Sequence, residues 1–475
     1  MLLVKDMSYN AVMGRKNEIM KKAIGVDYDV FSYGKLGFDY EKMMKKVGYS
    51  IEEVEKIQRE GKVGNTPLYE LKNINALVKK YASKGKGARI FLKDEAMNAS
   101  GSFKARRAAV SVYHAKKHGY KGVIAATSGN YGAAVAAQAL QRGLKCIIVQ
   151  EVYDSRKVGQ PEILEKTRKC EAYGAEVIRL SVGPELFYTL LCLLEETGYF
   201  NASLYTPFAI AGIETLGYEI ANQMKEIEGR YPDAVIATNA GGGNLVGTAR
   251  GLIKAGAKDT KIIGASVDLS GLHMASDIDF NKKSFTTGHT GFAIPFATWP
   301  DRTDVPRNAA RVLRYIDRYA KVTQGEVFYV TEALAQLEGL ERGPAGNTSL
   351  SAAIAIAREM DEDQIVVVQE TEYTGAGKHP NPQLTFAREN GIVVKRGKPV
   401  DSKPGESIMI PETFEQLSVT DIDVEELKFN LIRNAIEKSG LNSIGDEDFS
   451  FLVEDTNATE EFVEKALKKL NVVYQ

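Results

Sequence analysis

From Gly61 to about Lys378, short β-branched runs alternate with amphipathic helical segments, and this alternation restricts the fold more than any other feature. Strands and helices that alternate in this way form βαβ units, which build a mainly parallel sheet. The expected strands cover residues 88–92, 122–126, 145–150, 176–180, 234–238, 261–267 and 364–369. The expected helices cover residues 103–119, 132–142, 161–173, 184–197, 213–228, 245–255 and 349–360. The central part of the chain is therefore predicted to be an α/β core.

Both ends of the chain lack this alternation. The first sixty residues are rich in Lys, Glu and Met, whereas Pro380 and Pro382 interrupt the pattern before an acidic tail. The helices expected in the two end segments cover residues 40–46, 51–60, 424–439 and 460–470. A chain of 475 residues is also longer than one ordinary hydrophobic core. We therefore expect an N-terminal helical extension over 1–60, a core over 61–380 and a C-terminal helical extension over 381–475.

The bulk composition argues against several classes of partner. The formal net charge is −1 and the pI is about 6.6, which gives no basis for binding nucleic acid. No apolar run is long enough to span a membrane, and the start of the chain lacks the apolar stretch of a signal peptide. The three cysteines, Cys146, Cys170 and Cys192, form no CxxC pair, so we expect reduced thiols and no metal site. We expect a cytoplasmic protein.

Lys104 lies where a loop becomes a helix, in the sequence Ser100-Gly101-Ser102-Phe103-Lys104. The first turn of a helix disfavours a cation because the helix dipole is positive there. The neighbouring Arg106 and Arg107 would lower the pKa of Lys104 if the lysine were desolvated, and a neutral lysine can form Schiff bases. A solvated lysine in a first helical turn is the alternative interpretation.

Three strand-to-helix turns are unusual, and ligands of open parallel sheets bind at the carboxyl ends of strands. Thr127-Ser128-Gly129-Asn130 offers hydroxyls, an amide and backbone N–H groups suited to a carboxylate or phosphate, although it also suits a capped tight turn. Gly241-Gly242-Gly243-Asn244 lets the backbone close around a phosphate, with a purely structural turn as the alternative. Thr374, on a glycine-rich bend, offers a hydroxyl to a neutral ring nitrogen, or belongs to an ordinary turn. With Lys104, these groups are what pyridoxal phosphate and an amino acid require.

Four motifs in order resemble the fold type II pyridoxal-phosphate enzymes, the group of threonine synthase, cysteine synthase and tryptophan synthase β. They are Val63 to Leu68, Ser100 to Lys104, Thr127 to Gly132 and Gly241 to Asn244. The resemblance spans about residues 61–380 and implies two open, mainly parallel sheets with flanking helices. A smaller subdomain over about 101–215 is implied within the core. Ala99 and Ala105 depart from the family, which usually has Pro and Asp there.

The resemblance also implies roles for individual residues. Lys104 would carry the cofactor covalently, and Asn130 would bond the hydroxyl of its ring. The loop of Thr127, Ser128, Gly129 and Asn130 would hold the substrate carboxylate. The phosphate would be bound by Gly241, Gly242, Gly243 and Asn244. Thr374 would face the pyridine nitrogen.

Within this group, the whole chain resembles the family of the β subunits of 2-amino-4-ketopentanoate thiolase. The resemblance is carried by Met7–Glu18, Gly198–Pro207, Thr287–Gly291, Pro295–Arg302 and Glu341–Asn347. It implies coenzyme A-dependent cleavage of 2-amino-4-oxopentanoate to acetyl-CoA and alanine, in ornithine degradation. It also implies a smaller α subunit as partner, while the wider group implies a homodimer. The two terminal extensions are expected to contribute to a partner interface.

In the reaction, we expect Lys104 to remove the Cα proton as general base. The CoA thiolate would attack the C4 ketone, and the C3–C4 bond would break. His289 either polarises the ketone or is a structural or surface histidine. Arg302 and Arg307 either contact CoA phosphates or are solvated loop arginines. Cys146 and Cys170 are expected to be structural, because neither has a motif-linked base.

Two other functions use the same sequence features. A threonine synthase-like β- or γ-elimination or replacement enzyme would need the same cofactor but neither CoA nor an α subunit. A noncatalytic subunit with this fold would only scaffold a complex, and the presence of Lys104 with all three turns argues against it.

Overall fold

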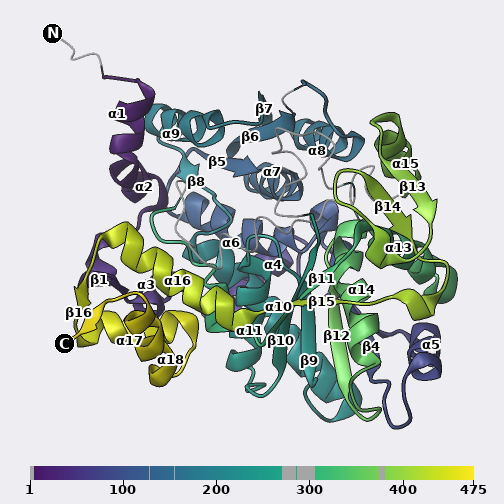
Figure 1. The fold of residues 1–475 in the computed structure, drawn as a ribbon. Coiled ribbons are helices and arrows are strands. Elements are labelled where there is room, and N and C mark those ends of the chain that lie inside the picture. Colours follow the sequence, from purple (N-terminus) through teal and green to yellow (C-terminus); the bar gives the residue numbers. More distant parts are fainter. Residues whose placement is uncertain (1–4, 128, 155, 270–284, 286–304, 374–379) are drawn as a thin grey trace.

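The structure, a computed structural model, describes residues 5–127, 129–154, 156–269, 285, 305–373 and 380–475. Two sheets form its centre, and helices cover their faces (Figure 1). The larger sheet has seven strands in the order β15-β11-β10-β9-β12-β4-β3, and the smaller has four in the order β7-β6-β5-β8. The predicted α/β class with two open, mainly parallel sheets is confirmed.

Five parallel strands make up the centre of the large sheet, and one antiparallel strand pairs at each edge. The strands are β3 (Leu68–Glu70), β4 (Arg89–Asp94), β9 (Ala234–Thr238), β10 (Lys261–Val267), β11 (Arg318–Val322), β12 (Ile365–Glu370) and β15 (Thr420–Ile422). Every residue of β12 is buried, as expected of a central strand with helices on both sides.

The small sheet is parallel throughout and lies within the subdomain expected over about 101–215. Its strands are β5 (Gly122–Thr127), β6 (Lys145–Tyr153), β7 (Glu176–Ser181) and β8 (Phe200–Asn201). The helices of this region are α6 (Lys104–Lys117), α7 (Asn130–Arg142), α8 (Pro161–Ala172) and α9 (Glu185–Thr197). Helix α7 is buried almost along its length, which its run of small residues permits.

Helices α10 and α11 pack against each other at very short range beside the large sheet. A Cβ atom on Gly217 of α10 would lie 2.0 Å from the carbonyl oxygen of Thr248, and one on Gly251 of α11 would lie 1.9 Å from that of Glu214. The glycines therefore allow the two backbones to touch. Helices α10 (Pro207–Glu228) and α11 (Gly243–Lys254) cover one face of the large sheet. The other face is covered by α5 (Lys72–Tyr81), α13 (Gln324–Glu338) and α14 (Pro344–Ala357).

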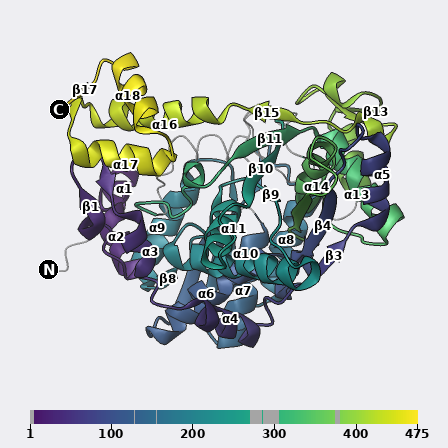
Figure 2. The same ribbon diagram turned by 90° about the horizontal axis from the view of Figure 1, so that it is seen from below.

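The two terminal extensions meet each other on one side of the molecule (Figure 2). The carboxylate of Asp448 accepts hydrogen bonds from the backbone N–H groups of Lys35 (2.8 Å) and Leu36 (2.7 Å). The N-terminal elements are α1 (Tyr9–Gly14), α2 (Lys16–Ile24), β1 (Ser32–Tyr33), β2 (Gly37–Phe38), α3 (Tyr40–Lys45) and α4 (Ile51–Glu60). The C-terminal elements are α15 (Pro380–Glu389), β13 (Val393–Arg396), β14 (Ser407–Ile410), α16 (Val424–Ser439), β16 (Ser443–Ile444), α17 (Asp446–Thr456), α18 (Glu460–Lys469) and β17 (Val473–Tyr474).

All seven expected core strands and all seven expected core helices are present, with differences at their ends. Helix α10 begins at Pro207 instead of residue 213, because the Thr206 side chain accepts a hydrogen bond from the N–H of Ala209 and caps it. The expectation that Pro380 interrupts the regular pattern is wrong, since Pro380 opens helix α15, where its missing N–H costs nothing. The C-terminal extension is also not wholly helical, because β15 pairs with β11. Within the described residues, no helix has the length and apolar character needed to cross a membrane.

Candidate active site

The loop before Lys104 has a strained backbone. Ser100 and Gly101 both have left-handed backbone angles, with φ of 67° and 77°, and a non-glycine residue adopts such angles only where its surroundings impose them. The surroundings here are the residues after β12. The N–H of Phe103 donates to the carbonyl of Thr371 (3.0 Å), and the N–H of Tyr373 donates to the carbonyl of Gly101 (2.9 Å). The lysine loop is therefore tied to the carboxyl end of the central strand.

Lys104 is the first residue of α6, and its side chain is half-buried with the ammonium 4.7 Å from the centre of the Phe103 ring. Burial, the largest cause, and the positive charges of Lys166 and Arg107 together lower the pKa of Lys104 to about 7, against an opposing effect of Glu372. About half of the lysine is thus neutral and nucleophilic at neutral pH. The pKa shift has the direction expected from the sequence for a desolvated Lys104.

Arg106 does not contribute to this effect, contrary to the expectation from the sequence. Its guanidinium is fully buried on another side of α6 and pairs with Glu95 (2.7 Å) and Glu219 (2.8 Å). The motif Gly64–Pro67 contacts the same two glutamates. The hydroxyl of Thr66 donates to Glu95 (2.6 Å), and the N–H of Asn65 donates to Glu219 (2.8 Å). The motif and Arg106 therefore brace the base of the lysine loop.

The triple-glycine turn follows β9 and opens α11, with no room for side chains on its glycines. A Cβ on Gly241 would lie 1.7 Å from the hydroxyl of Tyr205. A Cβ on Gly242, whose φ is +83°, would lie 2.0 Å from the side chain of Val312. The backbone N–H groups of such a turn at a helix start form an anion site.

Arg107 supplies a cation beside this turn. It lies three residues after Lys104, on nearly the same face of α6, and its guanidinium would be 2.9 Å from a Cβ on Gly243. Within the described residues, the Nε of buried Arg107 and both amide atoms of Asn244 have no hydrogen-bond partner. Buried polar groups are rarely left in this state, so the arrangement fits a bound phosphate group.

Thr127 and Asn130 flank the second turn, between β5 and α7. Both are buried, and the hydroxyl of Thr127 accepts a hydrogen bond from the N–H of Gly129 (3.2 Å). Lys104, the glycine turn and the turn after β5 each follow a strand and open a helix. The predicted site residues that the structure describes therefore lie at the carboxyl ends of strands.

Some predicted site residues lie outside the described residues: Ser128, His289, Arg302 and Thr374. Arg307, the other arginine suggested for CoA, stacks over the ring of Phe38 at 5.1 Å. Cys146 and Cys170 are buried, and burial raises the pKa of each thiol to about 12, which agrees with a structural role.

The sequence analysis did not identify four ionisable groups at the site: Arg107, Lys166, Glu370 and Glu372. Arg107 appeared only as a neighbour of Lys104, and Lys166 appeared only within an expected helix. Glu372 is buried and acts on both lysines, while burial raises the pKa of Glu370 well above its usual range. Their positions depend on how α6, α8 and β12 pack, and the spacing of residues does not reveal that.

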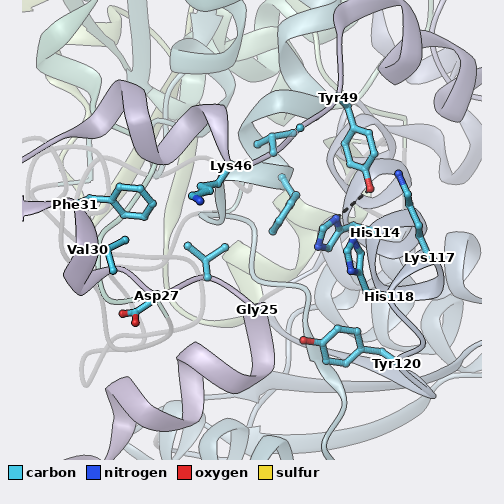
Figure 3. A pocket seen from close by; sticks show the side chains of 14 residues that line it. Gly25, Asp27, Val30, Phe31, Lys46, Tyr49, His114, Lys117, His118 and Tyr120 are labelled. Carbon is cyan, nitrogen blue, oxygen red and sulfur yellow. Dashed lines mark hydrogen bonds between the residues drawn. The ribbon is translucent and has the colours of Figure 1, made fainter.

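A separate cavity of about 590 Å³ lies where the N-terminal extension meets the far end of α6 (Figure 3). Lys117, in its wall, is about 20 Å from Lys104 along the helix, at ~1.5 Å per residue. The ring of His114 stacks on Phe208 and its Nδ1 lies 3.0 Å from the hydroxyl of Tyr49. The cavity is lined by Gly25, Val26, Asp27, Val30, Phe31, Lys46, Val47, Gly48, Tyr49, His114, Lys117, His118, Tyr120 and Phe208. It contains none of the turns around Lys104.

A half-buried lysine with a lowered pKa, a glycine turn suited to an anion and the turn after β5 are groups that a pyridoxal-phosphate site requires. Residues 60–371 match the protein family described as "Pyridoxal-phosphate dependent enzyme". The chain therefore belongs to the pyridoxal-phosphate dependent enzymes, and pyridoxal phosphate is its cofactor.

Two relatives resemble the chain over nearly its whole length. A 2-amino-4-ketopentanoate thiolase beta subunit from an unidentified prokaryote is 65% identical over 470 residues, covering 99% of this chain and 100% of the relative. The protein of that name from Acetoanaerobium sticklandii is 66% identical over 466 residues, covering 98% and 99%. Within its class, the chain belongs to the family of these thiolase beta subunits.

More distant relatives share the fold. A threonine synthase from a Bacillus species is 27% identical over 297 residues, covering 61% of this chain and 76% of the relative. Among solved structures, cysteine synthase from Entamoeba histolytica superposes with a TM-score of 0.52 at 22% identity, covering 67% of this chain and 87% of that one. The fold is thus that of the fold type II enzymes, as predicted.

Proposed function

We propose that the chain is the catalytic β subunit of a 2-amino-4-ketopentanoate thiolase. It would use CoA to cleave 2-amino-4-oxopentanoate into acetyl-CoA and alanine. The observation that carries this proposal is the identity of 65–66% over almost the whole chain to beta subunits of that name. The threonine synthase alternative is supported only by a distant likeness that covers 61% of the chain.

The described residues suit the binding and proton-transfer steps. Arg107 and the turn at Gly241–Asn244 would hold the cofactor phosphate, and Asn130 would hold its ring hydroxyl. When bound, pyridoxal phosphate supplies an electron-accepting ring that stabilises negative charge beside the amino-bearing carbon. Lys104, half neutral near pH 7, is suited to remove the Cα proton and to return one later.

The bond changes balance with CoA as the only other reactant. The CoA sulfur bonds to C4, the C3–C4 bond breaks, and acetyl-CoA leaves. A proton then replaces the lost bond at C3, which gives alanine. Cys146 and Cys170 are unsuited to carry an acyl group, because both are buried with raised pKa values.

The name "beta subunit" of the relatives supports a smaller α subunit as partner. We place the complex in the cytoplasm, because the three cysteines are free and no described helix is suited to cross a membrane. A β–β homodimer within the heteromer remains our expectation from the wider enzyme group.

The test combines the purified chain, with and without its α subunit, with CoA and 2-amino-4-oxopentanoate. Acetyl-CoA is measured directly, and Lys104→Ala serves as the control. The proposal predicts acetyl-CoA that depends on both substrates and disappears in the variant. A cofactor spectrum that responds to amino acids, with no acetyl-CoA even when the α subunit is present, would refute the thiolase and favour β-replacement.

A further inference from the structure

Helix α8 carries a charged pair on its buried face. Glu162 and Lys166 are one helical turn apart, form an ion pair, and are 1% and 2% exposed. Lysine is almost never fully buried, and a buried ion pair is weak evidence for stability because both ions lose their hydration. On the solvent face of the same helix, Arg168 and Glu165 form an ordinary exposed pair. The buried pair therefore invites a functional explanation.

Lys166 lies against the turn that opens α7. A Cβ on Gly129 would be 2.7 Å from Cδ of Lys166 and 3.5 Å from its Nζ, so the lysine passes directly beside the backbone of this turn. The same ammonium is, after burial, the strongest influence on Lys104. Lys166 therefore lies beside the turn and near enough to Lys104 for its charge to act on that lysine.

We propose that Lys166 binds the carboxylate of the amino-acid substrate at the turn beside Gly129, and that Glu162 orients its ammonium. The proposal rests on the proposed function only in taking an α-amino acid as the substrate. It adds a charged partner to a turn whose other groups, the Thr127 hydroxyl and backbone N–H groups, are neutral. A charge-assisted hydrogen bond is roughly twice as strong as a neutral one, so this partner would select α-amino acids over amines.

The charges around Lys166 agree with a bound anion. Besides Glu162, the groups that act on Lys166 are Glu372, which is attractive, and Lys169, which is repulsive. Lys104 adds a further positive charge when protonated. A substrate carboxylate would stabilise Lys166 against these neighbours and leave Glu162 to hold the ammonium in place.

Binding to the cofactor-loaded chain tests this without CoA or the α subunit. The cofactor's visible spectrum is titrated with alanine and with alaninamide, which lacks the carboxylate. In Lys166→Met, the Kd for alanine should rise roughly 10- to 100-fold, as expected for a lost charged hydrogen bond, while the Kd for alaninamide stays within about twofold. Arg168→Met removes a cation from the exposed face of α8 and should change neither.

Two further variants keep the test decisive if Lys166→Met does not load cofactor. Lys166→Arg should retain part of the selectivity for alanine, and Glu162→Gln should weaken alanine binding without weakening alaninamide binding. Equal losses for both ligands, or no loss in either, would overturn the proposal and make Lys166 structural. If Lys166→Met selectively loses alanine binding but the wild-type chain makes no acetyl-CoA even with its α subunit, the thiolase function is refuted and this assignment stands.

Discussion

The titration of Lys104 gives the sharpest quantitative prediction. With a pKa of about 7, half of its amines are neutral at pH 7, whereas an ordinary lysine with a pKa of about 10.4 is roughly 0.04% neutral. At pH 7, Lys104 in the cofactor-free chain should therefore react with an amine-selective reagent on the order of 1,000-fold faster than a lysine with the ordinary pKa, in proportion to its neutral fraction. Because the neutral form reacts, the rate should rise as the pH increases through about 7 and then level off.

The perturbation is Lys166→Met, which removes the positive charge with the largest effect on Lys104 but leaves the burial. The pH at which the acetylation rate of Lys104 is half-maximal should rise in the variant, because the charged form of Lys104 is less disfavoured. That pH should stay below 10, because burial is the larger cause of the lowered pKa. The assay is brief acetylation of the cofactor-free chain across pH 5–10, with mass spectrometry of the Lys104 peptide. Exposed Lys116 of the same helix is the internal reference. A midpoint above about 9 in the wild type, or a downward shift in the variant, would refute the reasoning.

Three further predictions concern the residues around Lys104. Arg107→Met should raise the Kd for pyridoxal phosphate roughly 10- to 100-fold by equilibrium dialysis, because a charged hydrogen bond is lost; unchanged affinity would remove Arg107 from the phosphate site. Gly241→Ala should weaken cofactor binding at least about 10-fold, since its Cβ would lie 1.7 Å from the Tyr205 hydroxyl, while the circular dichroism spectrum stays native; wild-type affinity would contradict the tight turn. Arg106→Met should lower the free energy of unfolding by about 3–5 kcal/mol in urea titrations, because two glutamates lose their buried partner; a loss below about 1 kcal/mol would contradict that pairing.

The elements that hold the site were predictable because their sequence patterns are local. Each predicted central strand is a short apolar run, and each key turn carries glycine or small polar residues between a strand and a helix. These patterns alone therefore suffice to place Lys104 and Gly241–Asn244 at helix starts. Strand β11 was missed because Arg318 and Lys321 interrupt its apolar pattern.

The missed helix α13 had a readable start. Thr323 and Glu326 form a reciprocal capping box, with the N–H of Glu326 donating to the Thr323 hydroxyl and the N–H of Thr323 donating to the carboxylate. The roles of Arg107 and Lys166, in contrast, were not readable. In the sequence, Lys166 forms an i,i+4 pair with Glu162 that is typical of a solvated helix face. The pair is buried because α8 packs against α7, β6, β7 and α15. Similarly, only the structure shows that Arg106 and Arg107, adjacent in the chain, serve different parts of the fold.

The most direct test of the central claim is to locate the covalently held cofactor. The cofactor-loaded chain would be reduced with borohydride, digested, and its peptides analysed by mass spectrometry. The account predicts the reduced cofactor on the peptide that contains Lys104, with Lys166 unmodified. Attachment to Lys166, to another lysine, or to none would contradict the site described for this chain.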